Sequence, residues 1–228
     1  MGVIFLGDTH GFFRFFREMM KNFDHDIPFE IVQVGDFGYW PGYIEQWPND
    51  FPWKTYFIAG NHEYYPHLRY DEVTQLKNNL FFVPRGEVLE IHGYTMGFMG
   101  GGFSVDKRQR KEGISWFPEE EVTEEDIAKL QNVQLDYLVT HTPPSEVILT
   151  VVGKLDKKSW GLYPEDVDTS AMRIQKLWEN LGKPQLISGH LHRSAVGPQY
   201  RVLDINEVYI VPPRYELSGS RGGAVVSL

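Results

Sequence analysis

The chain has 228 residues, 42% of them hydrophobic, and a formal net charge of −9, which fits one domain with a large buried core and argues against a chain-wide basic surface for nucleic acid. It contains no cysteine, which excludes disulfides, thiolate metal ligands and a cysteine nucleophile, and leaves oxygen and imidazole ligands for any metal ion. No stretch approaches the roughly 20 apolar residues of a membrane span. We therefore expect a single cytoplasmic domain over residues 1–228 that does not contact membranes.

The first predicted element is an apolar strand over residues 3–6, which ends at Gly7 and is followed by Asp8 and His10. Side chains at positions i and i+2 of an extended segment point the same way, so both groups can reach a single ion beyond the edge of a sheet. The carboxyl edge is where open α/β sheets bind ligands. The same pattern also describes an ordinary turn with a helix cap.

Helices and strands alternate in the next part of the chain. Apolar residues at helical spacing predict a first helix, namely Phe12, Phe15, Phe16, Met19, Met20 and Phe23. Two strands, over residues 30–34 and 54–59, end in a glycine followed by Asp36 and by Asn61 and His62. With another helix expected over residues 70–79, this order indicates βαβ units and a largely parallel sheet.

Two loops of unusual composition interrupt this pattern. Residues 39–52 are rich in aromatic residues, which either cover the core or line a pocket. After short strands predicted over residues 80–83, 88–91 and 95–99, a glycine run opens a loop that contains the basic segment 107–111. This segment is either a solvated surface turn or a contact for phosphate.

The last third of the chain repeats the pattern of a strand followed by polar residues. A capping box predicts a short helix after Thr123, and residues 145–167 are expected to form an irregular connection. A strand over residues 135–140 precedes His141, and a strand over residues 185–187 precedes His190 and His192. A helix capped by Asp168 or Thr169 is predicted between them. Short antiparallel strands over residues 202–205, 208–211 and 224–226 are expected to complete the fold.

Five predicted strand ends therefore carry carboxylate, amide or imidazole groups. The blocks read Asp-x-His, Gly-Asp, Gly-Asn-His-Glu, His and Gly-His-x-His, and they extend from Gly7 to His192. This ordered set resembles that of the calcineurin-like metallophosphoesterases. The resemblance implies an α/β sandwich of two mixed β-sheets flanked by helices, in four layers, with a two-metal site at the strand ends.

The resemblance also implies roles for the individual residues. One ion would be held by Asp8, His10, Asp36 and His192, and the other by Asp36, Asn61, His141 and His190. Ligands without sulfur suit manganese, our first expectation, with iron, zinc or nickel as alternatives. A pair of ions bridged by Asp36, about 3.5–4 Å apart, can activate a hydroxide that attacks the phosphorus in line. His62 would then protonate the leaving oxygen.

The chain departs from the protein-phosphatase branch of this family, whose Gly-Asp block continues as Gly-Asp-x-x-Asp-Arg-Gly. Here the run reads Gly35-Asp36-Phe37-Gly38-Tyr39-Trp40, without the arginine that grips a phosphomonoester. Tyr39 stands where a carboxylate would orient His62. The loop motifs over residues 101–106 and 115–118 instead resemble a small bacterial and phage branch.

We therefore predict a phosphodiesterase acting on nucleotide-like or nucleic-acid diesters. A diester carries one negative charge and needs less positive charge around it than a monoester dianion does. Tyr39, Arg108 and Arg110 are candidate contacts for the substrate. The alternatives are a phosphomonoesterase acting on nucleotides or phosphoproteins, and an interaction scaffold that has kept the fold and lost the chemistry.

Overall fold

The computed structural model describes residues 2–23 and 28–214, whose strands form two six-stranded mixed sheets. The first sheet has the strand order β12-β1-β2-β3-β5-β4. Its strands are β1 (Gly2–Leu6), β2 (Phe29–Gln33), β3 (Thr55–Phe57), β4 (Thr74–Lys77), β5 (Leu80–Phe82) and β12 (Val208–Val211). The second sheet has the order β10-β11-β9-β8-β7-β6. Its strands are β6 (Val88–Ile91), β7 (Tyr94–Met99), β8 (Tyr137–Thr140), β9 (Gln185–Ser188), β10 (Ala195–Val196) and β11 (Tyr200–Val202).

Each sheet is parallel in its middle and antiparallel at its two edges. In the first sheet β1, β2, β3 and β5 run parallel, and β12 and β4 pair antiparallel at the edges. In the second sheet β7, β8, β9 and β11 run parallel between β6 and β10. Because parallel strands end at the same edge, the residues that follow β1, β2 and β3 emerge side by side, and so do those that follow β8 and β9.

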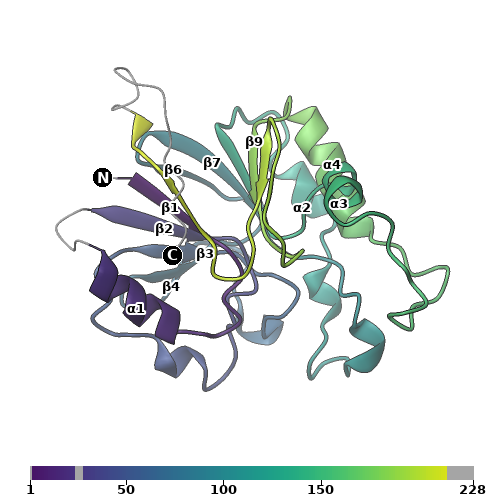
Figure 1. Cartoon of the computed structure of the whole chain (residues 1–228), viewed down its shortest axis with the longest axis horizontal. Coiled ribbons are helices and arrows are strands. Elements are labelled where there is room, and N and C mark those ends of the chain that lie inside the picture. The colour runs from purple at the N-terminus through teal and green to yellow at the C-terminus, as the bar shows by residue number, and fades with distance from the viewer. Residues whose placement is uncertain (1, 24–27, 215–228) are drawn as a thin grey trace.

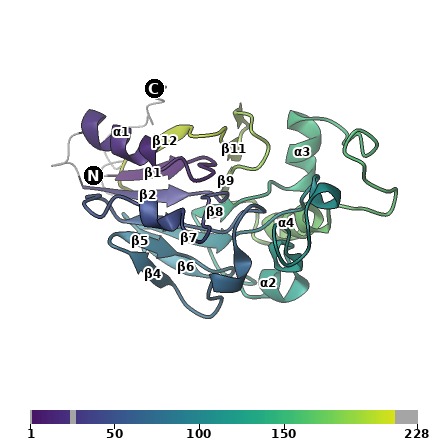
Figure 2. The same ribbon diagram turned by 90° about the horizontal axis from the view of Figure 1, so that it is seen from below.

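Helices cover the outer faces of the two sheets. The helices are α1 (Arg14–Asn22), α2 (Glu124–Ala128), α3 (Ser145–Val151) and α4 (Thr169–Asn180). Figure 1 shows α1 beside the first sheet and α2, α3 and α4 gathered on the opposite side of the molecule. Seen from below, in Figure 2, the same helices lie at the two ends of the molecule. The predicted α/β sandwich of two mixed sheets and flanking helices is confirmed.

The alternation of side chains along the strands builds these layers. In β1, Ile4 and Leu6 pack with Phe16 of α1, whereas Val3 and Phe5 point the other way and pack between the two sheets. This follows from the period of two along a strand, since every residue of β1 is apolar apart from its first glycine. A third apolar cluster, on the outer face of the second sheet, includes Ile174, Leu177 and Trp178 of α4.

Two of the predicted elements were wrong in type. The helix expected over residues 70–79 is instead β4, which forms an antiparallel hairpin with β5. Asn79 has a φ of 54°, a left-handed conformation that suits a tight turn and cannot continue a helix. The connection expected to be irregular over residues 145–167 begins with α3. The strand predicted over residues 224–226 lies outside the described residues. Among the helices that the structure describes, none is long and apolar enough to cross a membrane.

Candidate metal centre

The polar residues at the strand ends come together at one edge of the sandwich. The first sheet contributes Asp8 and His10 after β1, Asp36 after β2, and Asn61 and His62 after β3, and the second contributes His141 after β8 and His190 and His192 after β9. The seven residues predicted to bind metal thus form one cluster, although they are spread over more than 180 positions of the sequence. Their role as ligands stays a prediction.

The backbone of this cluster is unusual. His10, Asp36, His190 and His192 all have positive φ values, of 47°, 50°, 71° and 48°. The left-handed region is uncommon for residues other than glycine and costs about 1–2 kcal/mol each. Such strained conformations gather at functional sites, where the surrounding structure holds them. Strain at four neighbouring positions indicates that the fold is built to aim these side chains.

Two glycines allow the loops of the cluster to approach its carboxylates. A Cβ atom added to Gly60 would collide with the carboxylate of Asp36, and one added to Gly189 would collide with that of Asp8. Each glycine directly precedes a predicted ligand, Asn61 in one case and His190 in the other. The glycines at these strand ends are therefore required by close packing against the buried acids.

One half of the cluster is formed by Asp8, His10, Asp36 and His192, each of which offers one ligand atom within 4.8 Å of the others. The Nε2 atoms of His10 and His192 lie 3.0 Å apart. His192 Nε2 is 3.3 Å from Asp8 Oδ2, and His10 Nε2 is 3.8 Å from Asp36 Oδ2. The last of these oxygens is buried without a hydrogen-bond partner. This half therefore contains an unsatisfied buried oxygen beside imidazole nitrogens.

The other half is centred on His141, which is fully buried. Its Nε2 lies 3.0 Å from Asn61 Oδ1, 3.2 Å from His190 Nδ1 and 3.4 Å from Asp36 Oδ1. The Nδ1 atom of His141 is 3.0 Å from the carbonyl oxygen of Val34, so it is the ring nitrogen that donates, and Nε2 carries a lone pair.

The amide of Asn61 is oriented in the same sense. Its Nδ2 donates to Ser104 Oγ at 3.0 Å, which turns the acceptor Oδ1 toward His141. Lone pairs of His141 Nε2, Asn61 Oδ1 and Asp36 Oδ1 thus converge. A cation satisfies such a group, so the residues present fit divalent metal ions with nitrogen and oxygen ligands.

Electrostatics favour the same interpretation. Burial lowers the pKa of His190 to about 3 and of His10 to about 4, which keeps both rings in the neutral form that binds metals. Burial raises the pKa of Asp36 to about 7, and it also raises that of Asp8. Two carboxyl groups buried together are costly to ionise, and bound cations offset that cost.

Asp36 lies between the two halves. Its Oδ2 faces His10, and its Oδ1 faces His141 and accepts the backbone N–H of His62 at 2.9 Å. A carboxylate whose two oxygens face separate groups of ligands has the arrangement that a bridging ligand needs.

His62 and Glu63 follow Asn61 and serve different purposes. The half-buried ring of His62 lies edge-on to that of His10, with 5.7 Å between the ring centroids. Trp40 Nε1 donates to the carbonyl oxygen of His62 at 2.6 Å, which fixes this stretch of backbone. The buried Glu63 accepts the N–H groups of Gly38, at 3.0 Å, and of Gly60, and burial raises its pKa to about 8. Glu63 therefore ties the loop after β2 to the loop after β3.

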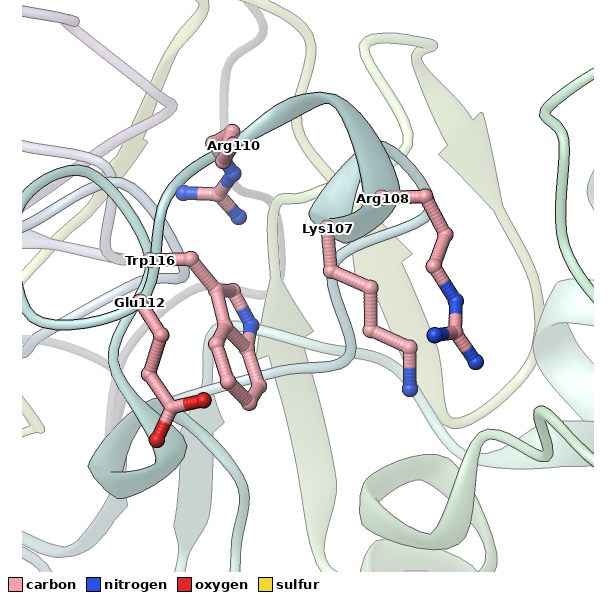
Figure 3. A pocket seen from close by; sticks show the side chains of 5 residues that line it. All are labelled: Lys107, Arg108, Arg110, Glu112 and Trp116. Atoms are coloured by element: carbon pink, nitrogen blue, oxygen red, sulfur yellow. The ribbon is translucent and has the colours of Figure 1, made fainter.

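Three of the four cations in the basic segment 107–111 lie beside carboxylates, and the fourth, Lys111, is exposed. Lys107 Nζ lies 3.1 Å from Asp166 Oδ1, and Arg108 binds the same carboxylate through Nη2 and Nε at 3.0 and 3.3 Å. Arg110 Nε lies 3.1 Å from Asp106 Oδ1, and its guanidinium also donates to Ser104 Oγ and to the carbonyl oxygen of Asn61. These three cations line a cavity of about 410 Å³ together with Glu112 and Trp116 (Figure 3).

Of the three predicted substrate contacts, none has its side chain free. Arg108 is held by Asp166, and Arg110 supports Asn61 from behind. The ring of Tyr39 packs on Phe57, with 6.1 Å between centroids. Their contact with substrate stays a prediction. Sequence reasoning missed Ser104, which orients Asn61, and Tyr43, which lines a cleft beside His62. The only sequence signal for Ser104 was its place in the motif after the glycine run.

The hydroxyl of Ser104 should matter for metal affinity. We expect Ser104→Ala to weaken manganese binding about 10- to 100-fold, as is typical when a group that orients a ligand is removed. Ser104→Thr, which keeps the hydroxyl, should restore most of the affinity. The affinity is measured by titrating the protein with Mn²⁺ and following the free ion by electron paramagnetic resonance. Ser159→Ala is the control, because Ser159 is exposed in another loop. Equal affinity in all variants would show that Ser104 does not position Asn61.

A family model described as calcineurin-like phosphoesterase matches residues 1–194, which include all the residues of the cluster. A search among curated proteins found no match.

Proposed function

Because the chain belongs to the calcineurin-like phosphoesterase family and is therefore a metal-dependent phosphoric ester hydrolase, we propose that it hydrolyses phosphodiesters of nucleotides or nucleic acids with two divalent transition-metal ions. Manganese is the ion that we expect first, and iron, zinc and nickel share the same ligand preferences. We further propose a cytoplasmic location, which agrees with the absence of cysteine.

The position of Asp36 is the observation that supports two ions rather than one. In this proposal Asp8, His10 and His192 complete one site, and Asn61, His141 and His190 complete the other, with Asp36 shared. When bound, a pair of such ions neutralises phosphate oxygens and activates a water molecule. His62 is left to hold a proton for the leaving oxygen, because its ring lies beside His10 and outside both groups of ligand atoms.

The pairing of Lys107, Arg108 and Arg110 with carboxylates favours a diester. A monoester dianion needs positive charge beyond the metals, usually from an arginine, whereas a diester carries a single negative charge. Arg108 and Arg110 are already occupied by carboxylates. Arg193 is the observation that supports a monoesterase as the second candidate, because it is exposed and directly follows His192.

A comparison of two aryl esters tests the substrate class. We expect kcat/KM with Mn²⁺ to be higher for bis-p-nitrophenyl phosphate than for p-nitrophenyl phosphate, and Arg108→Ala to change neither value more than about threefold. One charge-assisted hydrogen bond is worth about 1.5–3 kcal/mol, or about 10- to 100-fold in rate. A preference for the monoester that falls by this factor in Arg193→Ala would make the protein a monoesterase. If neither ester is hydrolysed, the result would favour the alternative of an interaction scaffold that has lost the chemistry.

A further inference from the structure

A small cleft adjoins the metal cluster on the side of His62. It has a volume of about 190 Å³ and is lined by His10, Gly38, Trp40, Tyr43 and His62. Two of these five residues belong to the cluster or act beside it, and two are aromatic residues from the loop over residues 39–52. The cleft therefore opens directly onto the place where the ester would be cleaved.

One wall of the cleft is rigid. Trp40 is fixed by its hydrogen bond to the carbonyl oxygen of His62, and its ring packs against Tyr64 and Phe117, with centroid distances of 5.5 and 6.3 Å. By contrast, Trp47 and Phe51 of the same loop are buried under α1 in the core. The loop thus divides its aromatic residues between covering the core and facing the site.

The other wall is the ring of Tyr43, which is largely exposed. The side chain of Tyr43 is 54% exposed, and within the described residues it makes no ring contact or side-chain hydrogen bond. Gly11 and Gly38 lie beside it, and a Cβ atom added to Gly38 would collide with the backbone of Gly11. The lining of the cleft thus combines two aromatic rings with glycine backbone, and its volume is about 190 Å³.

We propose that this cleft binds the nucleobase of the leaving nucleoside, stacked on Trp40 and Tyr43. The inference rests on the proposed function. It adds that the protein recognises a base on one side of the phosphate, the side of the leaving group. A base on this side belongs to the leaving group because His62 lines the same cleft. In the reaction, water adds to phosphorus, the P–O bond to the nucleoside breaks, and the nucleoside oxygen takes up a proton, which yields a free nucleoside and a phosphomonoester.

Aromatic stacking gives the expected size of the effect. Every nucleobase can stack on an aromatic side chain, so the contact does not depend on which base is present. Each stacked base usually raises the binding constant or the rate by roughly 5- to 150-fold. An alkyl group of similar size gains less, because it has no flat face to stack. We therefore expect kcat/KM for a diester to depend on the base of the leaving nucleoside and not on the base of the retained nucleoside.

The test uses the dinucleoside monophosphate of deoxyadenosine and its two analogues that lack one base. The product identifies the nucleoside that leaves. In the wild type, removal of the base from the leaving nucleoside should lower kcat/KM roughly 5- to 150-fold, and removal from the retained nucleoside less than about threefold. Tyr43→Ala should lower kcat/KM for the intact substrate and lose the discrimination, which Tyr43→Phe should keep. Trp160→Ala is the control, because Trp160 is also an exposed aromatic residue, 42% exposed, and lies on the segment between α3 and α4.

A binding measurement separates this inference from the proposed function. Saturation-transfer NMR of deoxyadenosine with the metal-free protein should show contact with wild type and Tyr43→Phe, and little with Tyr43→Ala. If neither dinucleotides nor bis-p-nitrophenyl phosphate are hydrolysed, the proposed function fails and the NMR result alone decides whether the cleft binds a base. Equal losses on removal of either base, or deoxyadenosine contacts that persist in Tyr43→Ala, would overturn the inference.

Discussion

Replacing Asp36 with asparagine should lower kcat/KM by about 10²-fold or more, the size of effect seen when a group that stabilises the transition-state charge is removed. The carboxylate of Asp36 places one oxygen toward His10 and the other toward Nε2 of His141, so it faces both halves of the cluster. The fold should survive, because asparagine Oδ1 can still accept the N–H of His62, and because asparagine tolerates the φ of 50° at this position. Alanine there would add backbone strain to the loss of the ligand.

Elemental analysis and thermal unfolding complete this test. The active wild type should contain two ions per chain and Asp36→Asn fewer, with similar melting temperatures for the two proteins in EDTA. The control is Asp168→Asn, which makes the same chemical change at the N-cap of α4 and keeps a good capping residue. One ion or none in active wild-type protein would contradict a shared site, and so would full activity in Asp36→Asn.

The sequence predicted the cluster because the information is local at each strand end. A buried apolar strand, a glycine and then a ligand residue recur after β1, β2, β3 and β9, and parallel strands bring their ends to one edge. The residues that aim the ligands were harder to predict. Ser104 lies 43 positions from Asn61, whose amide it orients, and nothing in the local pattern links the two.

Charge pairing over long distances explains why the sequence could not show how the basic segment is held. Four cations in five residues predict either solvation or an anionic ligand, but Asp166, which binds Arg108, lies 58 residues further along the chain. That acid belongs to the segment after α3, whose weak periodicity gave no indication of where it packs. The local run of cations therefore could not reveal that Lys107, Arg108 and Arg110 each lie beside a carboxylate.

The aromatic loop shows the same limit for apolar residues. Composition could not distinguish Trp47, which is 2% exposed under α1, from Trp40, which lines the cleft, because burial depends on where α1 lies. The wrong helix over residues 70–79 has a more local cause. These residues have a moderate helix propensity, but they form a strand because β4 pairs with β5 and the chain turns at Asn79.

The second large effect is expected at His62, whose replacement should depend on the leaving group. If His62 protonates the leaving oxygen, His62→Ala should lower kcat/KM about 10²–10⁴-fold for a dinucleotide, whose alkoxide is a poor leaving group. The loss should be far smaller for bis-p-nitrophenyl phosphate, because p-nitrophenolate leaves without a proton. Metal content should not change, and His67→Ala, at an exposed histidine nearby, is the matched control. Equal losses on both substrates, or loss of metal, would instead make His62 a ligand or a structural residue.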